Sequence, residues 1–181
     1  MERALLCGPL EAEHVPGYSP DAVRAFSEEF VRTEEDQAVK FKQFGVDSAY
    51  QERVLTAREW ALLMNEVAVD ALARAGLDSE SFLSQGADFL TDFLSDMPVV
   101  HAQMEMRRLQ HQNPSRHWQP NDHNDVIALS MAVVHCDVVV TEKHWAHLLT
   151  ERAALDKKHS TLVVDRKGLP ELLIYLLKAQ H

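Results

Sequence analysis

The first part of the chain carries apolar residues spaced three and four apart, the period of an amphipathic helix. A helix is predicted over residues 20–34, where Ser19-Pro20 provides a start signal. A second helix is predicted from the capping box Thr56–Glu59 to Gly76. A third covers residues 79–96, and a fourth begins at Pro98. Every element predicted before residue 113 is therefore helical.

Two segments are less regular. Glycines and prolines divide the first twenty residues, which predicts a loop with at most one short helix, over residues 2–7. Residues 39–46, which include Gly45, mix apolar and charged side chains, and their pattern fits either a helix or a loop. Both interpretations of that segment stay open at this stage.

The pattern changes after residue 120. Helical spacing over residues 121–135, 142–155 and 169–179 alternates with two short β-branched runs, at residues 138–140 and 160–164. A helix between two such strands predicts a right-handed crossover with parallel strands that are buried on both faces. We therefore expect an α-rich α/β fold with a small parallel sheet and flanking helices.

Length and composition predict one domain over residues 1–181. The chain has 181 residues, of which 46% are hydrophobic, enough for one sizeable core and too few for two comfortable ones. Within it, residues 1–97 form a helical portion, and residues 98–181 form a helix-strand-helix-strand-helix portion.

Charge and cysteine content narrow the function classes. The formal net charge of −10 argues against a dedicated basic nucleic-acid groove, although a site that collects cations also makes a chain acidic. Cys7 and Cys136 are the only cysteines, which is typical of a reduced compartment. The sequence has no apolar run of the roughly 20 residues that a membrane span needs, and no legible signal peptide. We therefore expect a cytoplasmic protein with no membrane partner.

The densest polar cluster covers residues 121–125. Asp122 and Asp125 are three residues apart, so both carboxylates lie on one face near a helix start. Mg²⁺ prefers oxygen ligands and usually takes only one or two protein carboxylates. The alternative is that Asn121 or Asp122 caps the helix and that Asp125 interacts favourably with the helix dipole.

A second polar cluster follows the first predicted strand. Thr141, Glu142 and Lys143 come directly after it, and ligands of open parallel sheets bind at the carboxyl ends of strands. The alternative is that Thr141 caps the next helix and Glu142 is a first-turn acid.

Histidines and arginines near these clusters offer further chemistry. Eight of the ten histidines lie between His101 and His159, but none forms a zinc-binding motif, and the pair His144 and His147 lacks a third ligand. The segment Arg116-His117-Trp118 is basic and aromatic, so it is a candidate for contact with a phosphate backbone, or a surface segment with a half-buried tryptophan.

The segments Asn121-Asp122-His123-Asn124-Asp125-Val126-Ile127-Ala128-Leu129 and Cys136-Asp137-Val138-Val139-Val140-Thr141-Glu142-Lys143-His144-Trp145 resemble the C-terminal half of a PIN-like nuclease domain. The resemblance covers residues 98–164. It implies that Asp125 is the acid that opens the helix, that Asp122 is its companion, and that Glu142 is the nearest match to the acid beyond the strand.

The resemblance does not extend to the first half of the chain. PIN-like domains begin with a strand that delivers an Asp, followed by a helical region that delivers a Glu, and neither pattern precedes Pro98. We interpret this as a truncated PIN-like domain. Glu2 and Glu66 are the alternative sources of a further acid, without a motif to support either.

The expected function is that of a metal-dependent endoribonuclease, with very slow or no cleavage expected of this form. Asp122, Asp125 and Glu142 would be the catalytic acids and would bind Mg²⁺ or Mn²⁺. Lys143, His144 and Arg116 would contact the RNA substrate. The alternative is a catalytically silent protein-interaction module, and the expected partners also include a second copy of the chain or an inhibitory protein.

Overall fold

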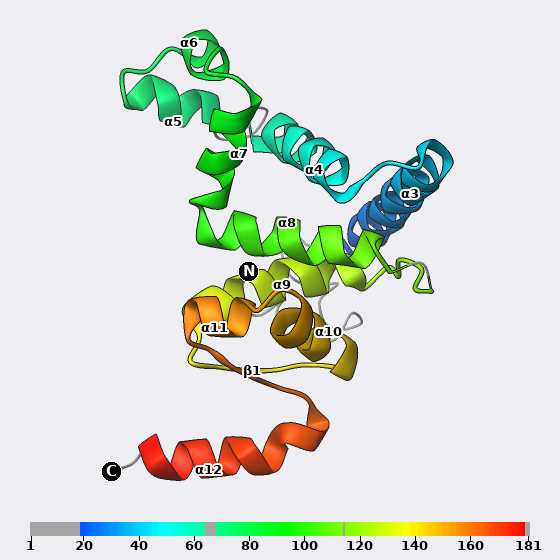
Figure 1. Cartoon of the computed structure of the whole chain (residues 1–181), viewed down its shortest axis with the longest axis vertical. Helices are drawn as coiled ribbons and strands as arrows, with labels where there is room; N and C mark the ends of the chain where they lie inside the picture. Colours follow the sequence, from blue (N-terminus) through cyan, green and yellow to red (C-terminus); the bar gives the residue numbers. More distant parts are fainter. Residues whose placement is uncertain (1–18, 64–67, 114, 180–181) are drawn as a thin grey trace.

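The computed structural model describes residues 19–63, 68–113 and 115–179 (Figure 1). Its first half contains the helices α3 (Pro20–Phe44), α4 (Ser48–Leu63), α5 (Val69–Arg74), α6 (Ser79–Leu83), α7 (Ala87–Ser95) and α8 (Pro98–His111). Its second half contains α9 (Asp122–His135), β1 (Val138–Val140), α10 (Lys143–His147), α11 (Leu155–His159), β2 (Leu162–Val164) and α12 (Leu169–Ala179). The predicted α-rich α/β fold with a small parallel sheet is confirmed. The helix predicted over residues 2–7 lies outside the described residues.

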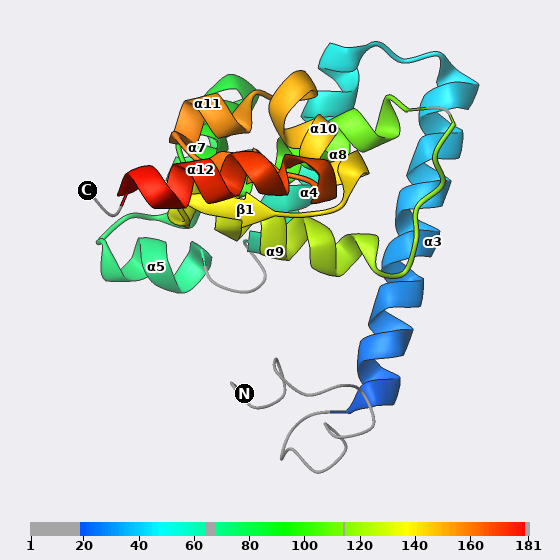
Figure 2. The ribbon, with the colours of Figure 1, turned by 90° about the horizontal axis from the view of Figure 1, so that it is seen from below.

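The two strands run parallel, as predicted, with Val138 opposite Leu162 and Val140 opposite Val164. Helices α9 and α10 contact one side of this sheet, and α12 lies on the other side (Figures 1 and 2). The prediction that both faces of the strands are buried is wrong for Val140, which is 53% exposed. The physical reason is that α12 packs more extensively against β2 than against β1.

Helix α3 is longer than predicted, because it ends at Phe44 instead of residue 34. Its start is as expected: the Ser19 hydroxyl accepts a hydrogen bond from the Ala22 amide. Its end is set by Gly45, which adopts the left-handed conformation (φ 57°) that favours glycine. Residues 39–44, left open by their pattern, form the last helical turns, in which the buried Phe41 packs edge-on against His111.

The capping-box prediction at Thr56–Glu59 is wrong. Helix α4 begins eight residues earlier, at Ser48, where the Asp47 carboxylate accepts a hydrogen bond from the Tyr50 amide. Thr56 and Glu59 are instead buried inside this helix, where Glu59 pairs with Arg107. The four residues therefore fit the capping-box sequence pattern, but they lie inside a helix and make tertiary contacts instead.

Two predicted long helices are interrupted. The helix expected over residues 79–96 is divided into α6 and α7 at Gly86, whose φ of 94° is incompatible with a helix. The helix expected over residues 142–155 is divided into α10, a π-helical turn (Leu148–Arg152) and α11. The second break lies at Ala154, which has a positive φ of 50°.

Two hydrophobic clusters share helix α8. One contains Met106 of α8 and residues of α9, β1, α10 and α11, with Trp145 only 1% exposed. The other contains Met104 of α8 with Trp60 of α4 and Leu94 of α7. Because α8 buries side chains in both clusters, it connects the helical first half to the half that contains the strands.

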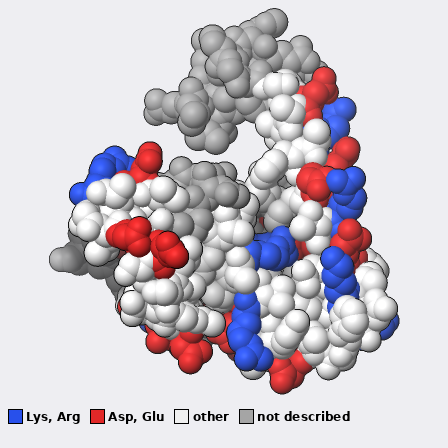
Figure 3. Space-filling model, turned by 90° about the horizontal axis from the view of Figure 1, so that it is seen from above, with Lys and Arg blue, Asp and Glu red and all other residues white. Residues whose placement is uncertain are grey.

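The exterior is mixed in character. The face drawn in Figure 3 carries basic and acidic side chains in alternation rather than one broad basic area. Helix α12 exposes a run of large apolar residues: Leu173, Ile174, Tyr175, Leu176 and Leu177. Among the described residues, no helix combines the length and the hydropathy needed to cross a bilayer.

Candidate functional site

Asp122 is the first residue of α9 and is only 2% exposed. Its Oδ1 accepts a hydrogen bond from Arg116 Nη2 at 2.7 Å, and its Oδ2 accepts one from the Gln119 amide at 2.9 Å. Asn121 occupies the N-cap position, but its side chain does not bind the first-turn amides. Asp122 therefore fixes the loop that leads into α9. A helix cap would instead accept hydrogen bonds from the first-turn amides of α9.

Asp125 links α9 to α10. Its Oδ2 accepts hydrogen bonds from Trp145 Nε1 at 3.0 Å and from Asn121 Nδ2 at 3.1 Å. Burial raises the pKa of this carboxyl group above its usual value, and the negative charges of Asp122 and Glu142 add to the rise, while the hydrogen bond from Trp145 opposes it. The ionised form of Asp125 is consequently costly in this position.

Glu142 follows Thr141 at the carboxyl end of β1 and occupies the N-cap position of α10. Its side chain is exposed and makes no capping hydrogen bond, and neither does Thr141 take the capping position. Lys143, the first residue of α10, is also exposed. The alternative, in which Thr141 caps the helix and Glu142 is a first-turn acid, is therefore wrong for both residues.

A hydrogen bond from Trp145 of α10 joins that helix, whose N-cap is Glu142, to Asp125 of α9, and the negative charges of Asp122 and Glu142 raise the pKa of Asp125. As the side chains stand, however, no three His, Cys, Asp or Glu residues in the described ranges surround a common point suited to a metal ion. Both oxygens of Asp122 are engaged by Arg116 and Gln119. The acids are neighbours, and a guanidinium group neutralises one of them.

Arg116 lies between the acids and the aromatic core, with its guanidinium carbon 5.5 Å from the Trp145 ring centroid. A cation over the face of a tryptophan ring is attracted by the ring's negative charge density. His144, the other predicted substrate contact on α10, places Nε2 3.0 Å from Gln110 Oε1. Burial lowers the pKa of His144, and the charge of Arg116 lowers it further.

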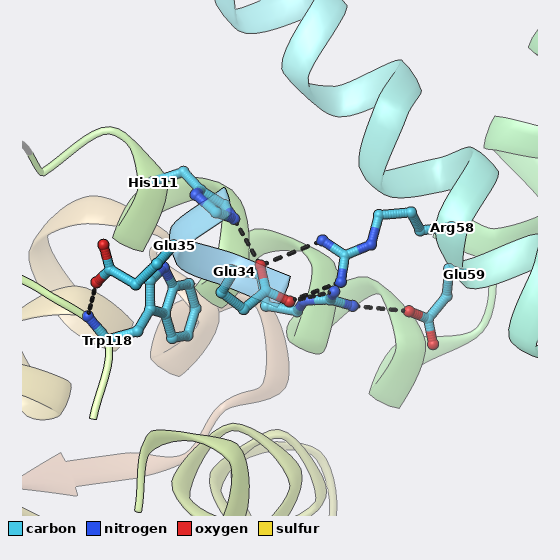
Figure 4. A network of polar contacts seen from close by, with 7 residues as sticks. Glu34, Glu35, Arg58, Glu59, His111 and Trp118 are labelled. Atoms are coloured by element: carbon cyan, nitrogen blue, oxygen red, sulfur yellow. Dashed lines mark hydrogen bonds and ion pairs between the residues drawn. The ribbon is translucent and has the colours of Figure 1, made fainter. Parts of the chain in front are cut away.

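Sequence reasoning missed a buried ion-pair network around Glu34 of α3, whose side chain is completely buried (Figure 4). Four donors converge on its carboxylate: Arg58 Nη1 and Nη2, Arg107 Nη2 and His111 Nε2, at distances between 2.6 and 3.2 Å. Arg107 also donates to Glu59 at 3.1 Å. The network fixes α3 against α4 and α8.

A sequence signal for this network existed. Glu34 is four residues after Phe30 and seven before Phe41, so a carboxylate interrupts an apolar helix face. Burial alone would raise the pKa of Glu34, but the His111 hydrogen bond and the charges of Arg107 and Arg58 outweigh it and hold that pKa well below its usual range. With its oxygens occupied by four donors, Glu34 is a structural acid and not a free metal ligand.

The next residue, Glu35, positions the segment before α9. Its Oε1 accepts a hydrogen bond from the Trp118 amide at 2.7 Å (Figure 4). His117 Nδ1 lies 3.5 Å from the same carboxylate. Glu2 and Glu66, the alternative acids of the sequence analysis, lie outside the described residues.

Comparison with known proteins found no matching family model, no matching curated protein and no matching solved structure. The resemblance to PIN-like nucleases therefore rests on the motifs of residues 121–129 and 136–145 alone.

Proposed function

We propose that the chain is a metal-dependent ribonuclease domain of the PIN-like type, with Asp125 and Glu142 as its principal metal ligands. The observation that carries this proposal is the hydrogen bond from Trp145 of α10 to Asp125, which joins the start of α9, with Asp122 and Asp125, to the helix whose N-cap is Glu142. The carboxyl end of a parallel strand is where open α/β sheets bind ligands.

Electrostatics supports this site. Burial raises the pKa of Asp125, and repulsion from the carboxylates of Asp122 and Glu142 adds to the rise. A divalent cation between them would remove the penalty and favour the ionised form. An acid whose pKa is perturbed, as that of Asp125 is, is a candidate for function on this physical ground.

The donor set fits a hard cation. Asp125 Oδ1 accepts no hydrogen bond from the described residues, since both of its partners bind Oδ2. Glu142 is exposed, so its carboxylate is free to turn toward Asp125. Two carboxylates suffice for Mg²⁺ or Mn²⁺, with water and phosphate oxygens completing the shell. Asp122 would join them only if Arg116 released it.

The residues around the acids have separate tasks in this proposal. A bound metal would supply an activated water and would stabilise the charge that develops on the phosphodiester. Trp145 holds Asp125 in place through its Nε1, while the exposed Lys143 offers its ammonium group to a phosphate. Arg116, once separated from Asp122, would supply a second phosphate contact with its planar fork of donors.

The test is Mn²⁺ binding, measured by the relaxation rate of water protons and by calorimetry. We expect the wild type to bind Mn²⁺ and Asp125→Asn, which keeps the size and removes the charge, to bind it much more weakly. Asp137→Asn is the matched control, because Asp137 is exposed and lies at the opposite end of β1. Absence of Mn²⁺ binding by the wild type, or equal binding by all three proteins, would refute the metal site.

One observation favours the silent interaction module as a second candidate. The apolar run on α12 is exposed, with Leu173 at 63% and Leu177 at 65%, and such patches mark interaction surfaces. If this candidate is correct, the wild type self-associates in light scattering, and Leu173→Glu with Leu177→Glu restores the monomer. Leu62→Glu, a change at an exposed residue of α4, should leave association unchanged.

A further inference from the structure

A cleft of about 690 Å³ opens between the end of α3 and the segment that joins α8 to α9. Its volume lies within the range of small-molecule binding sites. Neither Asp125 nor Glu142 lines it, but Arg116 does, and Arg116 pairs with Asp122, so the cleft adjoins the acidic site.

One wall of the cleft is apolar. Val39, Phe41 and Val46 line it from the end of α3, and Trp118 lines it from the segment before α9. Phe41 and Trp118 are 6% and 4% exposed and pack around the His111 ring, so they support this wall from below, while Val39, 60% exposed, offers its open apolar surface. A flat apolar body, such as a nucleobase, fits a wall of this kind.

The remaining wall carries polar atoms without partners. Four buried side-chain atoms of residues that line the cleft make no hydrogen bond within the described residues: Gln51 Oε1, Gln110 Nε2, His111 Nδ1 and Arg116 Nε. Buried polar groups are nearly always paired, so a concentration of exceptions calls for a ligand or ordered water. The set contains both an acceptor (Gln51 Oε1) and donors (Gln110 Nε2 and Arg116 Nε), as does the edge of a nucleobase.

The charges that face the cleft favour an anion. Lys42 and Arg116 line it, and Lys42 has no ion-pair partner in the described part of the chain. The one acid that lines it, Glu35, is engaged by the Trp118 amide. In a chain with a net charge of −10, Lys42 is therefore the positive charge most open to an anion in this cleft, beside Arg116, which already pairs with Asp122.

We propose that this cleft binds a nucleoside monophosphate, either free or as the end of an RNA strand. The base would lie against Phe41 and Val39, with its edge bound by the amides of Gln51 and Gln110. The phosphate would lie between Lys42 and Arg116. This site goes beyond the proposed nuclease function, because binding here needs no metal ion.

The test uses the full chain in EDTA, titrated with AMP, UMP, adenosine and inorganic phosphate. Calorimetry measures affinity, and the indole NH resonance of Trp118, assigned with Trp118→Phe, reports binding in the cleft. We expect AMP to bind and to shift this resonance, and both adenosine and phosphate to bind more weakly than AMP. Lys42→Gln should weaken AMP binding about tenfold, the effect of losing one charged hydrogen bond. Lys40→Gln, at an exposed residue of the same helix that does not line the cleft, should bind AMP as the wild type does.

Three results would overturn the proposal: no binding at about 5 mM AMP, equal affinities of the wild type and Lys42→Gln, or binding that leaves the Trp118 resonance unmoved. A 5′-phosphorylated tetranucleotide distinguishes the two sources of ligand. Affinity at least tenfold above that of AMP assigns the cleft to an RNA end, and equal affinity assigns it to the free nucleotide. Since EDTA removes metal ions, failure here leaves the Mn²⁺ test of Asp125 unaffected, and failure of that test leaves this one unaffected.

Discussion

Trp145 Nε1 donates a hydrogen bond to Asp125 Oδ2 over 3.0 Å, and this contact ties the start of α9 to α10 across the carboxyl end of β1. The indole ring itself is 1% exposed in the main core. A core side chain thus fixes the orientation of a candidate metal ligand, so that the position of Asp125 is as rigid as the packing around Trp145.

The raised pKa of Asp125 predicts a specific pH dependence. A carboxyl group whose pKa is higher in the folded than in the unfolded protein binds more protons when folded, so its contribution to stability falls as the pH rises above about 4. Asp125→Asn removes this titration. We expect the melting temperature of Asp125→Asn, relative to the wild type, to rise between about pH 4 and pH 7.

Asp137→Asn, exposed and distant from the three acids, serves as the control and should show no such trend. A constant difference between Asp125→Asn and the wild type across this pH range would mean that Asp125 titrates normally.

Replacement of Glu34 by Gln should destabilise the fold strongly. The change leaves Arg58 and Arg107 without a full counter-charge in a buried site, which costs about 3–5 kcal/mol. Glu28→Gln, an exposed change on the same helix, should stay within about 0.5 kcal/mol of the wild type. Urea denaturation at pH 7 measures both free energies of unfolding, and similar values for the two variants would show that the network contributes little.

The same network predicts the acid limit of the fold. Because the pKa of Glu34 is lowered in the folded state, its contribution is fully present above the unfolded-state pKa of about 4.5. That contribution is lost as the pH falls toward the lowered value. We expect the free energy of unfolding of the wild type to fall below about pH 4.5 more steeply than that of Glu34→Gln, as measured by urea titration at each pH.

Arg116→Gln should have opposite effects on stability and on cation binding. It leaves the buried Asp122 carboxylate without its ion-pair partner, at a cost of about 2 kcal/mol. It also removes the positive charge that competes with a metal for Asp122. We expect lower stability in urea and tighter Mn²⁺ binding in calorimetry. Weaker Mn²⁺ binding by a folded Arg116→Gln protein would instead show that Arg116 supports the metal site.

Cleavage of single-stranded RNA should be very slow with either Mg²⁺ or Mn²⁺. Arg116 and Gln119 hold Asp122, so the metal would be bound mainly by Asp125 and Glu142 and would orient water and phosphate imperfectly. A displacement of about 1 Å can cost about a hundredfold in rate. A gel assay with labelled RNA tests this expectation. Rapid cleavage that is lost in Asp125→Asn would show that the site rearranges when substrate binds.

The C-terminal half was more predictable than the first half because its signals were local. The β-branched runs at β1 and β2 and the helix between them were enough to predict the parallel pairing. The break after Arg152 escaped prediction because Ala154, an ordinary helix former, adopts a positive φ there. No local pattern in the sequence indicates that conformation.

The acids of the candidate site were also predictable from local sequence, but their partners were not. A polar cluster at a helix start pointed to Asp122 and Asp125, whereas the pairing of Asp122 with Arg116 depends on how the preceding loop folds back. The network around Glu34 joins residues 24 to 77 positions apart. Spacing along α3 therefore indicated only that an acid lies on an apolar helix face, and not which residues pair with it. Long-range ion pairs of this kind depend on the assembled fold.

Helix α8 carries Met104 and Met106, two residues apart, into different hydrophobic clusters. If α8 unwinds, both clusters lose the side chains that α8 contributes. Unfolding of one half of the chain that involves α8 therefore destabilises the other half. The amide protons of α8 should consequently exchange with solvent only when the whole protein unfolds, and they should be among the slowest to exchange. A helix that serves two cores thus makes one cooperative folding unit of two differently built halves.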